Sequence, residues 1–174
     1  MIDEAELREN AWVTEGEGIS RRAGGRMMVH CFVMMFFGYM GGFVWLINLA
    51  DGVLHILPAP KFDIDVSDRA ELLRNTHTGP IMNSVFAMAM LLLSTRLRFS
   101  LRQAKWWYYG TIVMLWGNAV GYVTAVYAPE RGLQPVGSWP NLISYATFYV
   151  AVVGATIATG ICLKAAVDVA QGKK

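Results

Sequence analysis

Four long stretches without any charged residue constrain this chain more than any other feature of its sequence. They lie between Arg26 and Asp51, Arg74 and Arg96, Lys105 and Glu130, and Arg131 and Lys164. Each is long enough for the roughly 20 apolar residues with which a helix crosses a membrane. Because lipid offers the backbone no hydrogen-bond partner, such a segment is expected to be helical. The pattern predicts an all-α, integral membrane four-helix bundle with helices at about 27–50, 69–95, 105–129 and 141–163.

Composition and charge agree with one membrane domain. Hydrophobic residues make up 55% of the chain, which is too much for an ordinary soluble domain. We expect a single domain over residues 24–168, with polar tails at 1–23 and 169–174; the first tail lacks the apolar stretch of a cleaved signal peptide. Lys and Arg are concentrated in these tails and in the loop 96–105, which predicts that both termini are cytoplasmic. The basic residues are thereby explained by membrane orientation, and they give no indication of nucleic-acid binding.

A histidine and three other polar residues are expected at one level of the membrane. His77 lies where the second span begins, and an ionisable residue in such a place is a functional-site hypothesis by default. Asn118 and Tyr122 are four residues apart and share one helix face. From the direction of each helix and its rise of about 1.5 Å per residue, His77, Asn83, Asn118 and Tyr122 all fall in the outer half of the bilayer. We therefore expect these four side chains to converge on one pocket.

Each of these residues also has a structural interpretation that the sequence leaves open. His77 would suit a solvated position at the membrane boundary, Asn118 an interhelical hydrogen bond, and Tyr122 an aromatic belt. His30, at the cytoplasmic end of the first helix, lies about 20 Å from His77 by the same arithmetic and is more typical of a structural histidine. His55, in the outer loop, is expected to be solvated.

The turn after His77 has two interpretations. Pro80 cannot donate to the carbonyl of Thr76, so a kink there, beside Gly79, would leave room for a large flat ligand next to His77. Alternatively, Gly79 and Pro80 simply begin the span, since proline is favoured in a first helical turn.

Two further patterns concern packing and helix ends. Gly38 and Gly42 form a GxxxG pair, which predicts close approach of another helix. The sequence from Asp68 to Glu71 predicts a capping box that starts the second helix outside the membrane.

The stretches that carry the polar residues resemble the motifs of a known family. Residues 76–83 are similar to the His-Ser-Gly-Pro-x-x-Asn motif of styrene oxide isomerases, and residues 116–122 to their Trp-Ala-Asn-x-x-x-Tyr motif. Residues 128–133 are similar to the Ser-Pro-Asn-Arg-Gly-Leu that follows it, and the interval between the first two motifs agrees without a gap. The resemblance covers about residues 24–165. The long acidic N-terminal tail departs from the family pattern, as do details of the first and fourth helices, and these departures bear on substrate range more than on chemistry.

The resemblance implies a small membrane enzyme that assembles as a homotrimer, binds haem b and isomerises aryl epoxides to aldehydes in styrene and other aromatic hydrocarbon degradation. Carried over by position, His77 would be the axial ligand of the ferric haem iron, Asn83 and Tyr122 would be catalytic, and Asn118 would line the substrate site with Tyr122. A ferric iron with one protein ligand can act as a Lewis acid on the epoxide oxygen, and a 1,2-hydride shift then gives the aldehyde. The implied partners are a small hydrophobic epoxide and the lipid of a bacterial inner membrane.

Two other classes of function remain as alternatives. A b-type cytochrome subunit would need two axial histidines per haem, and depth separates His30 from His77. A small transporter or assembly subunit would bind no cofactor. Arg74 and Arg131, at the outer boundary, are candidates to contact haem propionates and equally good interface anchors.

Overall fold

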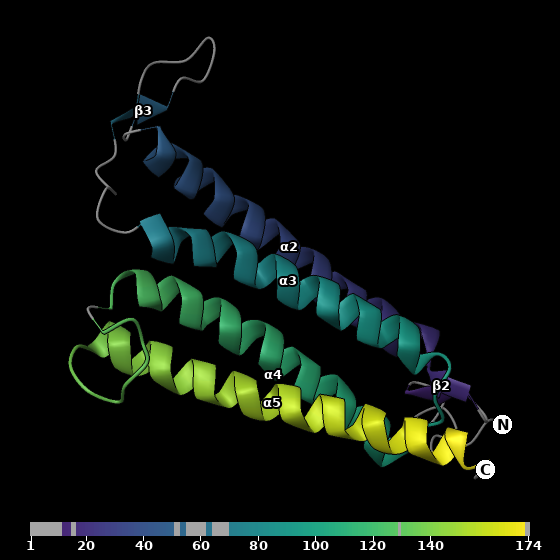
Figure 1. Ribbon diagram of the computed structural model, residues 1–174. Helices are drawn as coiled ribbons and strands as arrows, with labels where there is room; N and C mark the ends of the chain where they lie inside the picture. The colour runs from purple at the N-terminus through teal and green to yellow at the C-terminus, as the bar shows by residue number, and fades with distance from the viewer. Residues whose placement is uncertain are drawn as a thin grey trace, which may run out of the picture.

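Four long helices make up the fold (Figure 1). The computed structural model describes residues 12–14, 17–50, 53–54, 62–63, 70–128 and 130–172. The helices are α2 (Arg21–Leu49), α3 (Ala70–Ser94), α4 (Leu101–Val126) and α5 (Trp139–Ala170). Two short antiparallel strand pairs are added, one of β1 (Val13–Thr14) with β2 (Glu17–Ile19) and one of β3 (Val53–Leu54) with β4 (Phe62–Asp63). The predicted four-helix bundle is confirmed, and both strand pairs lie outside it.

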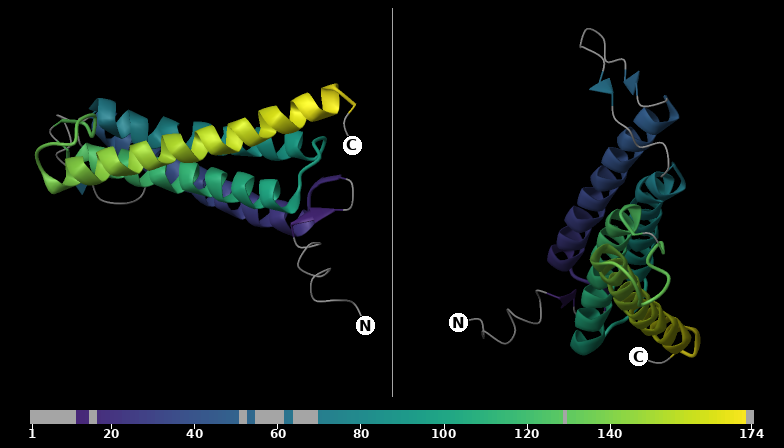
Figure 2. Two further views of the ribbon diagram at one scale, coloured as in Figure 1. Left: turned by 90° about the horizontal axis from the view of Figure 1, so that it is seen from below. Right: turned by 90° about the vertical axis from the view of Figure 1, so that its left-hand side faces the viewer.

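The helices form two tightly packed pairs. α2 packs mainly against α3 and α4 mainly against α5, while contacts between α3 and α4 join the pairs. Glycines bring α4 and α5 close: a Cβ added at Gly110 would stand 2.8 Å from the carbonyl oxygen of Gly154, and one at Gly154 would stand 2.6 Å from that of Gly110. The four helices run lengthwise along the bundle, tilted relative to one another, and the start of α2 and the end of α5 lie at the same end (Figure 2). We call the opposite end, which carries β3 and the loop between α4 and α5, the distal end.

Local caps rather than hydropathy set the starts of α2 and α4. α2 begins at Arg21, earlier than the expected 27, because the Ser20 hydroxyl accepts a hydrogen bond from a backbone amide of the first turn. α4 begins after Ser100, which forms a capping box with Gln103. α5 continues past the expected 163 to Ala170. α2, α4 and α5 therefore extend beyond the apolar spans on the side of the termini.

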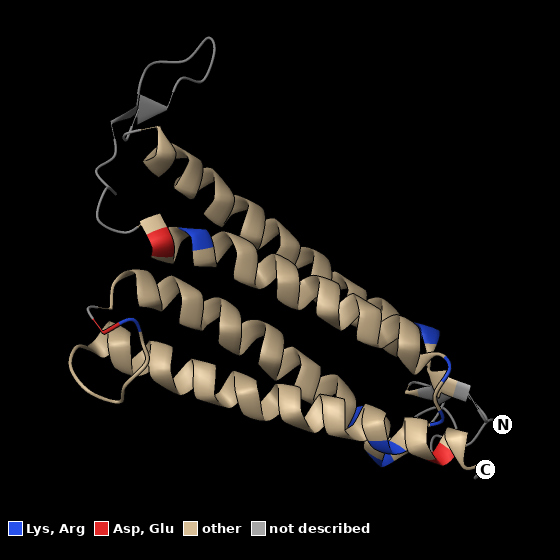
Figure 3. Cartoon of the chain, in the orientation of Figure 1, with Lys and Arg blue, Asp and Glu red and all other residues tan. Residues whose placement is uncertain are grey.

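The surface of the bundle fits a membrane environment. Within the four described helices, charged side chains are confined to the ends, with Lys and Arg gathered at the end that holds the termini (Figure 3). α2 and α5 are each long and apolar enough to cross a membrane, by length and composition. Large apolar side chains lie on the outside, including Phe36, Leu92 and Val152 at 66%, 71% and 62% exposure. Which side of the membrane the termini face stays a prediction.

Candidate active site

His77 lies on α3 against a glycine-rich side of α2. Its Nδ1 is 2.9 Å from the carbonyl oxygen of Gly38. Because a carbonyl only accepts hydrogen bonds, Nδ1 donates and carries the ring proton. Nε2 therefore keeps its lone pair and is the nitrogen that can bind a metal. The half-buried ring also lies 5.9 Å from the ring of Trp45, with 32° between their planes.

Two glycines of α2 make room for this imidazole. A Cβ added at Gly42 would stand 2.8 Å from Cε1 and 3.0 Å from Cγ of His77. One added at Gly38 would stand 2.9 Å from the carbonyl oxygen of His77. The GxxxG pair thus allows the close helix packing that was predicted for it. It also forms the surface against which His77 packs.

Tyr122 of α4 packs against α3 with Asn83. Its ring fills the space beside Gly79, where an added Cβ would overlap the ring atoms. Phe148 of α5 meets it edge-on, with ring centroids 5.1 Å apart and 68° between the planes. The Asn83 side chain approaches Tyr122, yet among the described residues its buried amide nitrogen has no partner at hydrogen-bond distance. That nitrogen is a donor able to bind a further acceptor.

His77 and Tyr122 do not converge within one chain. Gly79, against which Tyr122 packs, follows His77 by two residues and so lies about 200° further around the helix. The two rings are therefore on opposite sides of α3. The structure brings Asn83 and Tyr122 together, but it separates them from His77. Beside Gly79 itself the ring of Tyr122 fills the space, and room for a flat ligand next to His77 stays a prediction.

The second predicted span continues through its proline. Pro80 is buried inside α3, which starts well before it, so the interpretation that Pro80 lies in a first helical turn is wrong. Ser84 donates a hydrogen bond to the carbonyl oxygen of Pro80 at 2.7 Å. Asp68 of the predicted capping box and His55 lie outside the described residues.

His30 forms a hydrogen bond of its own, away from His77. The indole nitrogen of Trp116 donates to Nδ1 of His30 at 3.2 Å, which leaves the proton of a neutral His30 on Nε2. Gly38, which holds His77, is eight residues further along α2, or about 12 Å. The two histidines therefore do not face a common metal within one chain. Asn118 is half-buried one turn from Tyr122 on the same face of α4.

Two cavities lie at the distal end of the bundle. The first, the Tyr122 cavity, has a volume of about 230 Å³ and is lined by Tyr122, Phe148, Leu72 and Leu133 among others. Arg131 and Glu71 also line it, and their side chains form an ion pair at 3.1 Å. Arg131, a candidate to contact a haem propionate, is thus paired with a carboxylate of its own chain.

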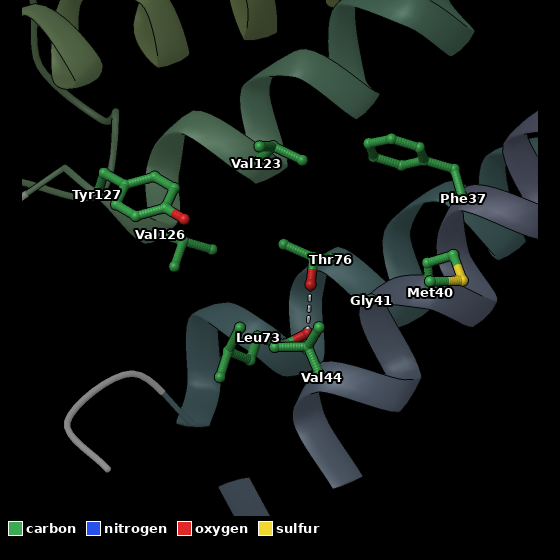
Figure 4. Close-up of a pocket in the computed structure, with 9 residues that line it drawn as sticks. All are labelled: Phe37, Met40, Gly41, Val44, Leu73, Thr76, Val123, Val126 and Tyr127. Atoms are coloured by element: carbon green, nitrogen blue, oxygen red, sulfur yellow. Dashed lines mark hydrogen bonds between the residues drawn. The ribbon is translucent and has the colours of Figure 1, made fainter. Parts of the chain in front are cut away.

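The second cavity, of about 210 Å³, lies between α2, α3 and α4 (Figure 4). Its walls are almost wholly apolar and include Phe37, Val44 and Val123. The Thr76 hydroxyl within it donates to the carbonyl oxygen of Leu73 at 2.7 Å. None of the site residues predicted from the sequence lines this second cavity.

Phe148 and Trp45 are neighbours of the site that sequence reasoning missed as such. Both appear in the sequence as ordinary membrane aromatics, and only the register between helices shows which polar residue each one contacts.

Comparison with known proteins identifies the family. The family described as styrene oxide isomerase matches residues 23–167, which is most of the chain. No curated protein matches the chain at a significant level. The family match includes the stretch around His77 and Asn83 and the stretch that ends at Tyr122. The chain therefore belongs to the styrene oxide isomerase family.

Proposed function

We propose that this chain is a haem-dependent isomerase that converts aryl epoxides such as styrene oxide to aryl acetaldehydes in the degradation of aromatic hydrocarbons. Family membership supports an isomerase that acts on styrene oxide. The observation that carries the haem part of the proposal is the hydrogen bond from Nδ1 of His77 to Gly38. A histidine that binds a metal through one nitrogen commonly donates its other N–H to a carbonyl or carboxylate, which fixes both tautomer and orientation.

The residues around His77 fit one axial ligand of haem b. Nε2 has the required lone pair, and the close contacts of Gly38 and Gly42 hold the ring in one orientation. When bound, a ferric haem supplies a Lewis acid for the epoxide oxygen. His30 has its own partner in Trp116, so His30 of the same chain is not oriented as a second ligand of this iron. This arrangement supports an isomerase over the bis-histidine haem of an electron carrier.

Tyr122 and Asn83 are suited to bind the epoxide oxygen. A phenol and an amide are neutral hydrogen-bond donors that orient an oxygen without removing a proton. Opening the benzylic C–O bond leaves a cation that the aryl group stabilises, and a hydrogen then migrates with its electron pair to that carbon. No atom is gained or lost. Asn118, one turn away on the face of Tyr122, would contact the same substrate.

The separation of His77 from Tyr122 supports assembly of several copies. Because the two rings lie on opposite sides of α3, a haem held by His77 would come next to the Tyr122 of another copy where the two copies pack with these sides together. The α3 surface between them is apolar and uncovered, with Met82 at 65% and Val85 at 48% exposure. We expect a homotrimer in a bacterial inner membrane, with cytoplasmic termini, that takes up its hydrophobic epoxide from the lipid.

Turnover measured with and without haem tests this function. Protein purified in detergent should form phenylacetaldehyde from styrene oxide in proportion to its haem content. His77→Ala should lose both haem and turnover, whereas His30→Ala should keep its haem. Isomerisation at full rate by haem-free protein would refute the proposal.

A further inference from the structure

The Tyr122 cavity has the size and lining of a site for one aromatic ring. Its volume is about 230 Å³, and an apolar protein cavity of about 150 Å³ already binds benzene. Leu72, Leu133 and Phe148 give it apolar walls, and Phe148 presents a ring next to Tyr122. Aromatic groups pair favourably in such edge-to-face arrangements. The space fits one ring with a short substituent.

A solvent-exposed ion pair lines this cavity. Glu71 comes from the first turn of α3 and Arg131 from the loop between α4 and α5, so their 3.1 Å contact links the two helix pairs of the bundle. Both side chains are more than half exposed, at 55% and 57%. An ion pair so exposed to solvent is weak. It can therefore break and form again during turnover.

The loop that carries Arg131 is fixed to the elements that carry Tyr122. Arg131 and Gly132 both have positive φ, at 58° and 68°, a conformation that a non-glycine residue keeps only where its surroundings hold it. The fully buried Asn141 side chain accepts from the Gly132 amide at 2.6 Å and donates to two further loop carbonyls. Ser144, one turn along α5, donates to the carbonyl of Gly121 at 2.9 Å. Arg131 is thus held in a defined place beside the cavity.

We propose that the Tyr122 cavity binds the ring of an aryl epoxide and that the Glu71–Arg131 pair is a latch that keeps bulk water out of it. The inference rests on the proposed function and adds to it. Isomerisation breaks the benzylic C–O bond and moves a hydrogen with its electron pair, so nothing enters from solvent. A water molecule that reached the benzylic carbon would instead add its oxygen, lose a proton and give a diol. A reaction cavity that borders water at the membrane surface therefore needs a closure.

Product analysis tests the latch. Glu71→Gln and Arg131→Gln should change the product from aldehyde alone to a mixture of aldehyde and diol, with the visible spectrum of the haem unchanged. Exchanging the charges, Glu71→Arg with Arg131→Glu, should restore the aldehyde. The matched control is Lys164→Gln, which removes the exposed Lys164–Asp168 pair at the opposite end of the bundle and should leave the product unchanged. Aldehyde as sole product, at the parent rate, in both single variants would overturn the latch.

Binding of an unreactive ring tests the cavity without turnover. Leu72→Trp fills the cavity and should weaken the binding of fluorobenzene about tenfold or more, as overpacking does. The affinity is measured by fluorine NMR in lipid nanodiscs, with empty nanodiscs as the reference. Leu92→Trp, on the exposed surface of the same helix, is the control and should bind as the parent does.

Equal fluorobenzene affinity in Leu72→Trp and the parent would overturn the ring site. If the parent turns over no epoxide, the proposed function fails, yet loss of fluorobenzene binding in Leu72→Trp would still support an aromatic site in the Tyr122 cavity.

Discussion

Replacing Gly42 with alanine is expected to weaken the proposed binding of haem while leaving the fold in place. The added Cβ would stand 2.8 Å from Cε1 and 3.0 Å from Cγ of His77, well inside the separation at which carbon atoms pack. The three nearest atoms that this Cβ would meet all belong to the imidazole. The ring must therefore turn away, and its 2.9 Å hydrogen bond to Gly38 is lost.

The substitution changes two quantities, the affinity for haem and the stability of the fold. Loss of the partner that orients a metal-binding histidine typically lowers metal affinity about 10- to 100-fold, which corresponds to about 1.4–2.8 kcal/mol. Alanine in place of glycine within a helix otherwise stabilises the fold by about 0.5–1 kcal/mol. Because no iron holds the imidazole of the apoprotein, the ring can turn away from the added methyl group. We therefore expect the dissociation constant of haem to rise about 10- to 100-fold while the apoprotein keeps its helical fold.

Haem titration of the apoprotein, followed by the Soret band, measures the change in affinity. Gly160→Ala is the matched control, since a Cβ at Gly160 would meet no atom of the described residues within 4 Å. In a His77→Ala background, Gly42→Ala should stabilise the apoprotein in thermal unfolding as Gly160→Ala does, because the obstacle is gone. Unchanged haem affinity in Gly42→Ala, or an equal loss of stability in both backgrounds, would refute the reasoning.

Three further predictions address other parts of the structure. Tyr122→Phe should lower kcat about 100-fold, the typical cost of losing a donor to a reacting oxygen, with the Soret band retained; an unchanged kcat would show that the hydroxyl does not bind the epoxide oxygen. Asn141→Ala should lower the free energy of unfolding by about 2–3 kcal/mol, because buried partners lose their hydrogen bonds, and a thermal shift no larger than that of the exposed cap variant Ser100→Ala would contradict this. Val85→Cys, on the exposed face of α3, should be cross-linked between copies by a short bismaleimide, while Val152→Cys on the exposed side of α5 should stay uncrosslinked; the reverse pattern would contradict the expected packing of copies.

The number and order of the helices could be predicted because a charge in lipid is costly, so charge-free stretches of sufficient length are informative. The helix ends could not be predicted in the same way. Beyond the apolar span, an end depends on local groups such as the Ser20 hydroxyl or the Ser100 capping box. Hydropathy carries no signal for these groups.

The depth of each site residue could be estimated from the sequence, but its direction around the helix could not. His77, Asn83 and Tyr122 were expected to meet because they share a level in the membrane. The structure places Tyr122 against Gly79, on the far side of α3 from the ring of His77. The rotation from His77 to Gly79 follows from helix geometry alone, but the neighbour that each side of α3 faces depends on the packing of α2 and α4.

The contacts of His77 with the glycines of α2 could not be predicted from the sequence either. Gly38 and Gly42 carry a clear sequence signal for close packing. Their contact with the imidazole depends on the register of α2 against α3, which a single sequence does not contain. The hydrogen bonds of Asn141 could not be foreseen either, because they join a side chain of α5 to a loop of irregular conformation.

The central proposal is that Nε2 of His77 binds a haem iron, and that His30 does not. Electron paramagnetic resonance of the purified ferric protein tests it most directly, because the signal reports the axial ligands of the iron. We predict the signal of a single axial imidazole, absent in His77→Ala and unchanged in His30→Ala. A low-spin bis-histidine signal, or a full haem complement in His77→Ala, would contradict the claim.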